Sequence, residues 1–151
     1  KAVRARFFGM NLYKIQMQSA NLDQSDFRRC DMAEADMRGS SFKNARFNHA
    51  NICNANFEPL MFGGGGTTKR FSPCDFSGAS MTYANLAGAK MRMGIFRDAD
   101  LTNANLRGAD LRECDFTGAN LENAILDDAN TEGAILPAVK TGSAFKMKAA
   151  D

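Results

Sequence analysis

The stretch Ala99–Asp128 reads ADLTN ANLRG ADLRE CDFTG ANLEN AILDD and consists of consecutive blocks of five residues. Each block begins with a small residue and has a large apolar residue at its centre, two positions later. The same period extends over most of the chain, from Phe7 to Leu136, with an interruption near residue 60. A sustained internal repeat predicts a repetitive fold in which each unit packs on its neighbours.

A period of five residues fits neither an α-helix nor a flat β-strand. On a helix, five residues turn the chain by roughly 140° beyond one full turn, so the apolar centres would face all directions. On a strand, the odd period would place successive centres on opposite faces. The chain is therefore expected to bend once in every unit.

A second period shows how many units close one coil. Phenylalanines recur at intervals of twenty residues, in two triplets and one pair: Phe7, Phe27 and Phe47; Phe76, Phe96 and Phe116; Phe42 and Phe62. Twenty residues are four units, so the sequence predicts a four-sided coil in which like residues stack. Twelve units before the break and fourteen after it make 26, which predicts about 6.5 coils.

The blocks at residues 104–118, ANLRG, ADLRE and CDFTG, resemble the A(D/N)LXX repeat of the pentapeptide-repeat proteins. The resemblance covers about residues 5–136. It implies an all-β fold, a right-handed quadrilateral β-helix, in which the central Leu or Phe and the small residue two positions before it point inward. We therefore expect the β-helix at residues 1–136 and a C-terminal cap or tail at 137–151.

The repeat is interrupted once. Phe57 and Phe76 are 19 residues apart, one fewer than four units, and a run of four glycines lies between them. Fixing consecutive glycines in one backbone conformation costs much conformational entropy. Pro59 precedes the segment and Pro73 follows it. We predict a loop at about 63–70 that projects from the coil and is a candidate interaction site: Gly63, Gly64, Gly65, Gly66, Thr67, Thr68, Lys69 and Arg70.

Charge sorted by side gives a second candidate surface. If the repeat resumes so that Phe71 stacks on Phe47, basic residues gather on one side of the coil. One interpretation is that this side binds an acidic partner. The other is that alternating charges on the sides only make the rod soluble. Together with Arg70 of the loop, the candidate basic face consists of Arg6, Arg28, Arg29, Arg46, Lys90, Arg92 and Arg112.

Reactive residue types are sparse and do not form a catalytic pattern. Cys30, Cys74 and Cys114 occupy small inward positions, and Cys53 points outward, so structural, reduced thiols are expected; they favour a cytoplasmic location. Without CxxC or Cys/His spacing, no metal or other cofactor is indicated. No acidic residue is obviously placed to orient His49, the one histidine. The recurrent Asp residues before the centres are expected to hydrogen-bond to neighbouring turns.

These features predict a non-enzymatic scaffold that binds a protein partner through its faces and the 63–70 loop. A small-molecule substrate is not indicated, no apolar run approaches the ~20 residues of a membrane span, and nucleic acid is disfavoured because the basic face lacks interleaved aromatic residues.

The resemblance implies an alternative, because some family members imitate B-form DNA, bind type II topoisomerases such as gyrase and confer resistance to their inhibitors. A net charge of +2 opposes such mimicry. The open ends of the coil also suggest an end-to-end homodimer.

Overall fold

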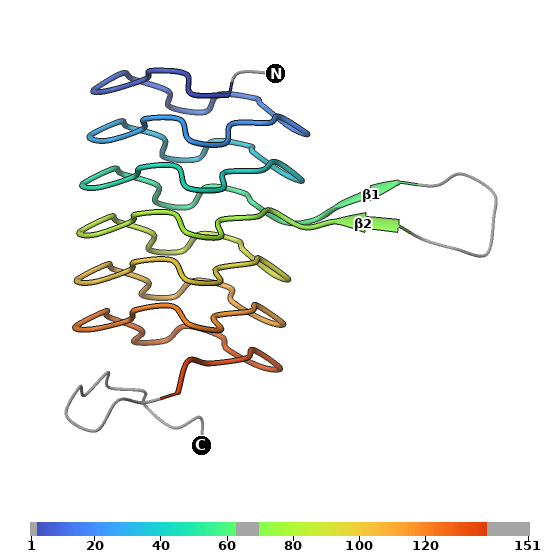
Figure 1. Ribbon diagram of the computed structural model, residues 1–151. Coiled ribbons are helices and arrows are strands. Elements are labelled where there is room, and N and C mark those ends of the chain that lie inside the picture. Colours follow the sequence, from blue (N-terminus) through green and yellow to red (C-terminus); the bar gives the residue numbers. More distant parts are fainter. Residues whose placement is uncertain (1–2, 63–69, 139–151) are drawn as a thin grey trace.

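A computed structural model describes residues 3–62 and 70–138 of the chain (Figure 1). These residues form a stack of four-sided coils, as the twenty-residue period predicts. Parallel bridges join equivalent residues of successive coils, for example Arg6 to Asp26 and Asp26 to Arg46. Apart from a hairpin, the described residues contain no longer strand and no helix, so the fold is held by single bridges, one for each side of each coil.

Each side of the coil contains six repeat units, and we number the sides in chain order. Their central residues are Phe7, Phe27, Phe47, Met81, Leu101 and Leu121 on the first side; Leu12, Met32, Ile52, Leu86, Leu106 and Leu126 on the second; Met17, Met37, Phe57, Met91, Leu111 and Thr131 on the third; and Leu22, Phe42, Phe76, Phe96, Phe116 and Leu136 on the fourth.

The bend in each unit lies at the second residue after the centre. This position has a positive φ, as in Arg29 (57°), Gly39 (64°) and Asn54 (56°). An Asp or Asn side chain before the centre supports the bend, because it accepts a hydrogen bond from the backbone amide two residues later, as Asp100 does from Thr102 at 3.0 Å. This is an Asx turn. The expected bonds of these side chains to neighbouring turns are therefore mostly bonds within their own turn.

On the second side, a continuous row of Asn side chains also connects successive coils. The Asn105 amide donates to Asn85 at 3.1 Å, Asn85 donates to Asn51 at 3.3 Å, and Asn51 donates to Asp31 at 2.9 Å. This ladder adds side-chain hydrogen bonds to the backbone bridges along one side of the rod.

The core is a column of stacked side chains inside the coil. The rings of Phe76 and Phe96 stack with centroids 4.9 Å apart, and those of Phe96 and Phe116 at 4.8 Å. The rings of the first triplet also stack, with Phe27 at 4.7 Å from Phe7 and at 5.0 Å from Phe47. Both predicted triplets are confirmed.

The predicted pair of Phe42 and Phe62 is wrong. Phe42 stacks on Phe76 at 5.0 Å, across the interruption. Phe62 lies in a hairpin of two short antiparallel strands, β1 (Leu60–Phe62) and β2 (Arg70–Ser72), which projects from the side of the stack (Figure 1). The predicted loop residues 63–69 lie outside the described residues, and Arg70 is part of β2.

The assumed register after the interruption is also wrong. Arg46 pairs with Ser80, so Met81 rather than Phe71 follows Phe47 on the first side. Pro59 gives the physical reason. It occupies the bend position, where other units have a positive φ, but its ring fixes φ near −65°. The chain leaves the coil there, and neither Phe62 nor Phe71 is a repeat centre, which reduces the 6.5 predicted coils to six.

The C-terminal segment is only partly described. Residues 137 and 138 follow the last repeat unit, and the rest of the cap or tail predicted at 137–151 lies outside the described residues. Over residues 3–62 and 70–138, the chain has no helix that could span a membrane.

Candidate functional site

The corrected register divides the predicted basic face between two opposite sides. Arg6, Arg28, Arg29 and Arg46 lie on the first side, in its first three units. The remaining three residues lie on the third side, in its fourth and fifth units: Lys90, Arg92 and Arg112. The single stripe along one side is therefore wrong, because the expected register counts two repeat units, centred on Phe62 and Phe71, that belong to the hairpin segment instead.

The third-side group is largely neutralised by neighbouring acids. Arg112 donates two hydrogen bonds to Asp110, at 2.8 and 2.6 Å. These bonds hold the pKa of the Asp110 carboxyl below its usual value. Arg92 lies 3.6 Å from Glu113. Two of the three basic residues there already have an acidic partner, so this part of the predicted face offers little free charge.

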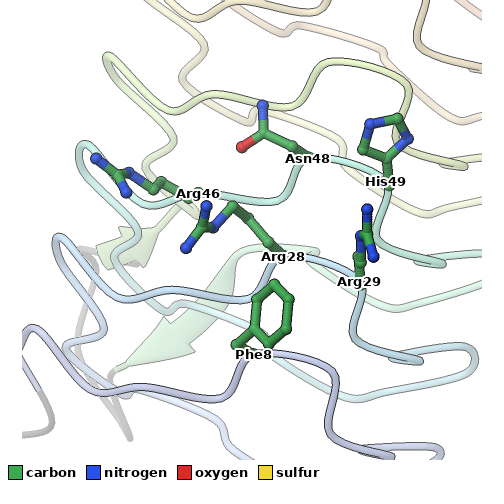
Figure 2. A pocket seen from close by; sticks show the side chains of 6 residues that line it. All are labelled: Phe8, Arg28, Arg29, Arg46, Asn48 and His49. Atoms are coloured by element: carbon green, nitrogen blue, oxygen red, sulfur yellow. The ribbon is translucent and has the colours of Figure 1, made fainter.

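The first-side group surrounds an open hollow of about 560 Å³ (Figure 2). Successive coils bring its lining together, since every residue of the lining follows or precedes a central residue of the first side. The lining residues are Phe8, Arg28, Arg29, Arg46, Asn48 and His49. This arrangement follows directly from the repeat, which places equivalent outward positions of the first three coils above one another.

The arginines of the hollow differ in what they bind. Arg28 is held by Asp26 through hydrogen bonds of 2.8 and 2.6 Å, and its guanidinium lies 5.4 Å from the centre of the Phe8 ring. The hydrogen bond from Arg28 lowers the pKa of Asp26. Arg29 and Arg46 form no ion pair with any residue of 3–62 or 70–138. Their two exposed guanidinium groups remain available to a ligand.

Two further residues, Asn48 and His49, complete the rim of the hollow. The Asn48 amide donates to the hydroxyls of Ser80 and Thr82, each at 2.7 Å, and this fixes its side chain on the next coil. The His49 ring stacks on Tyr83 with centroids 5.1 Å apart. In Figure 2 the guanidinium of Arg29 points toward His49.

The hairpin forms a second exposed feature, of different chemistry. The side chains of Met61, Phe62 and Phe71 are 63%, 51% and 43% exposed. Met61 is paired with Phe71 across the two strands, so two of these apolar side chains lie next to each other on a projecting arm. Arg70, the described member of the predicted loop, adds one positive charge opposite Phe62.

Three of the four cysteines, Cys30, Cys74 and Cys114, are buried in the coil. Burial raises the pKa of the Cys74 and Cys114 thiols to about 12 each. The Sγ of Cys114 donates to the carbonyl of Met91 at 3.0 Å, and that of Cys30 to the carbonyl of Phe7 at 2.9 Å. These thiols are structural, as the small inward positions predict. No group of three or more His, Cys, Asp or Glu residues within 3–62 and 70–138 could hold a metal ion.

Sequence reasoning missed three surface residues because it sorted the outward positions by charge. Phe8 and Met61 are large, apolar and exposed, and Asn48 is neutral. Phe8 could have been found, because it occupies the position directly after the central Phe7, where most units carry a polar residue.

Comparison with protein families identifies the repeat. The model of the pentapeptide repeats, in eight copies, matches residues 20–58, 70–92 and 95–136. The unmatched residues 59–69 correspond to the start of the hairpin segment. No curated protein sequence matches the chain.

Several solved structures are similar to the chain. HetL, a pentapeptide repeat protein involved in heterocyst differentiation regulation in Nostoc, is 25% identical with a TM-score of 0.43; the match covers 89% of this chain but only 59% of HetL. Rfr23 of Cyanothece is 17% identical with a TM-score of 0.42, over 87% of this chain and 90% of Rfr23. QnrB1, a plasmid-mediated fluoroquinolone resistance protein, is 17% identical with a TM-score of 0.49, over 87% and 72% of the two chains.

Proposed function

The chain belongs to the pentapeptide repeat family, whose fold is a right-handed β-helix, and we propose that it acts as a rigid, non-enzymatic scaffold that binds a protein partner. The projecting hairpin carries this proposal. A short hairpin that exposes Met61, Phe62 and Phe71 leaves apolar surface in water, at a cost of ~25 cal/mol per Å². Exposed apolar clusters of this kind mark sites of protein interaction.

The rest of the coil supports a scaffold. Its interior is filled with buried apolar side chains that form one continuous core cluster. Backbone bridges connect each coil only with its neighbours, as in other solenoids. The hairpin projects from the side of this stack, between the third and fourth sides of the coil (Figure 1).

The alternative function is modulation of a type II topoisomerase by DNA mimicry. It is favoured by the projecting hairpin and by a slight acidic excess on the second, third and fourth sides. The excess is only one or two charges on each of these sides, whereas B-DNA carries one charge per ~1.7 Å of axis. Such weak charge is insufficient for imitation of a duplex, and we place this function second.

A crosslinking experiment tests the scaffold function. A photoreactive residue replaces Met61 in one variant and Asn103, an outward residue of the coil, in the matched control. In extract of the source organism, we expect Met61 to crosslink to a discrete protein that Asn103 does not capture. Addition of a Met61→Ser/Phe71→Ser variant as competitor should not reduce this crosslink, whereas unlabelled wild type should. Equal crosslinking from both positions would contradict a partner site on the hairpin.

The alternative needs a separate assay. The purified chain is added to gyrase in a supercoiling reaction, with and without a quinolone. We expect no change in supercoiling or in its inhibition. Protection of gyrase by the wild type but not by the hairpin variant would replace the scaffold proposal with the topoisomerase one.

A further inference from the structure

The arginine hollow on the first side is a second candidate surface, separate from the hairpin. The hairpin leaves the coil between the third and fourth sides, whereas the hollow lies on the first side and at its junction with the second. The two features therefore lie on different parts of the rod's circumference. The proposed scaffold function and the role of the hollow can be tested separately.

The charge of the first side is concentrated in the units that form the hollow. Its first three units carry four arginines against Asp26 alone, and Asp26 is already bound to Arg28. The last three units of the same side carry no basic residue and two acids, Asp100 and Glu122. The positive surface is therefore a patch and not a stripe, and it spans two coil spacings, or roughly 9.6 Å along the rod.

The available groups define the ligand. Arg29 and Arg46 provide two guanidinium groups without an ion pair, and guanidinium groups bind carboxylates in a bidentate manner. The ring of Phe8 is 54% exposed and provides apolar surface at the edge of the hollow. Nearby Asp31 is occupied, because it accepts hydrogen bonds from the Ala33 amide at 3.2 Å and the Asn51 side chain at 2.9 Å.

We infer that the hollow binds a short acidic segment of a protein partner, with carboxylates on Arg29 and Arg46 and an adjoining apolar side chain against Phe8. An extended chain rises ~3.3 Å per residue, so three to four residues cover the patch. This inference deepens the proposed scaffold function, on which it rests, by naming the chemistry of a second contact.

Nucleic acid fits the same patch less well. A duplex presents one phosphate charge per ~1.7 Å, about six over the length of the patch. Phosphates farther along the duplex would meet Asp100 and Glu122, in the fifth and sixth units of the first side, and these carboxylates repel phosphate. The exposed rings of this side are Phe8 in the first coil and the stacked pair of His49 and Tyr83 in the third and fourth coils, with Arg28 and Arg29 between them. They do not form a continuous row of aromatic side chains for base stacking.

Fluorescence anisotropy with a defined probe tests this inference. The probe is a fluorescein-labelled ten-residue peptide with four glutamates and two phenylalanines spaced by serine and glycine. Its control has glutamine in place of each glutamate. We expect saturable binding of the acidic peptide at ~50 mM salt, weaker binding at ~200 mM because exposed charges are screened, and no binding of the glutamine peptide.

Two charge-matched variants locate the contact. Arg29→Gln/Arg46→Gln should weaken binding of the acidic peptide by about tenfold or more, since the variant lacks both guanidinium groups that bind its carboxylates. Lys90→Gln/Arg92→Gln removes the same charge from the third side and should leave the affinity unchanged. All four side chains are outward, so thermal unfolding should show that both variants remain folded. Equal weakening by the two variants would show a net-charge effect and overturn the assignment.

Further arms separate the remaining outcomes. Phe8→Ala should remove the preference for the peptide with phenylalanine over one with alanine at those positions. The Met61→Ser/Phe71→Ser variant should bind the peptide as the wild type does, so failure of the hairpin proposal does not affect this result. Absence of peptide binding would overturn the inference, as would tighter binding of a 20-base-pair duplex than of the peptide under the same conditions.

Discussion

Phe42 and Phe62 are twenty residues apart, yet they have opposite environments. Phe42 is fully buried and stacks on the Phe76 ring of the next coil, whereas Phe62 is half-exposed on the hairpin. The difference does not lie in the two phenylalanines but in the bend between them. Most units between Phe7 and Phe57 bend at a residue with positive φ, and the last unit before the hairpin has Pro59 at that position. The bend after Phe57 requires a positive φ that Pro59 does not adopt, and this decides the path of the chain although the apolar residues keep the repeat spacing up to Phe62.

The contrast predicts very different costs for removing a ring from the two regions. Phe96→Ala should lower the free energy of unfolding by ~3–5 kcal/mol, because it leaves a cavity between Phe76 and Phe116. Phe71→Ala should lower it by about 0.5 kcal/mol or less, as for an exposed side chain. Urea titration of both variants measures the difference. Similar destabilisation by the two substitutions would contradict the assignment of Phe71 to the hairpin.

Excision of the hairpin sharpens the same comparison. Deletion of residues 60–73 removes Pro73 but keeps Pro59. It joins the unit ANFEP (55–59) to the unit CDFSG (74–78) and restores the five-residue period. The deleted chain should fold as an uninterrupted coil, but with a proline at a bend that needs positive φ. With Pro59→Gly in the deleted chain, the bend becomes accessible and the free energy of unfolding should rise by about 1–3 kcal/mol.

The matched control is Pro59→Gly in the full-length chain, where the hairpin remains. Since this proline is not at a positive-φ bend there, the substitution should not be stabilising, and the added freedom of glycine in the unfolded chain should cost a few tenths of a kcal/mol. Stabilisation of both chains to the same extent would show that Pro59 does not set the point at which the chain leaves the coil.

Acid affects the coil and should hardly affect the hairpin. Hydrogen bonds from Arg112 lower the pKa of Asp110 below 3.8, and those from Thr117 lower that of Asp115. A carboxyl with a lowered folded-state pKa stabilises above its unfolded value, and this contribution is lost as the pH falls through the folded-state pKa. Stability should therefore decline below about pH 4. Asp110→Asn should make thermal unfolding less dependent on pH in this range; an unchanged dependence would contradict the role of Asp110.

Most of the coil could be predicted from the sequence because each unit repeats the same physical requirements. A small residue, a polar residue that closes an Asx turn and a large apolar centre recur over a hundred residues, and the twenty-residue spacing of Phe7, Phe27 and Phe47 gives the number of sides. The family resemblance added the handedness. A single position such as Phe62 carries no such redundancy, and the period alone predicts it as a repeat centre.

The candidate surfaces could be predicted only in part because they depend on the register. Arg28, Arg29 and Arg46 precede the interruption, and their common side was predicted correctly. Lys90, Arg92 and Arg112 follow it, and the two extra units expected around Phe62 and Phe71 place them two sides away from their observed position. The signal that could have prevented the error is Pro59, since proline is incompatible with the bend position.

Thiol crosslinking tests the register across the hairpin, on which the whole assignment of surfaces depends. In a chain with its four native cysteines replaced, Asn48→Cys/Thr82→Cys places two thiols on adjacent coils of the first side, where the native side chains are 2.7 Å apart. Stacked coils are ~4.8 Å apart, within reach of a disulfide. We predict that this pair oxidises readily to an intramolecular disulfide and that Asn48→Cys/Ser72→Cys does not. A disulfide in the second pair and none in the first would place Phe71 on Phe47 and reunite the basic residues on one side, contrary to the structure described here.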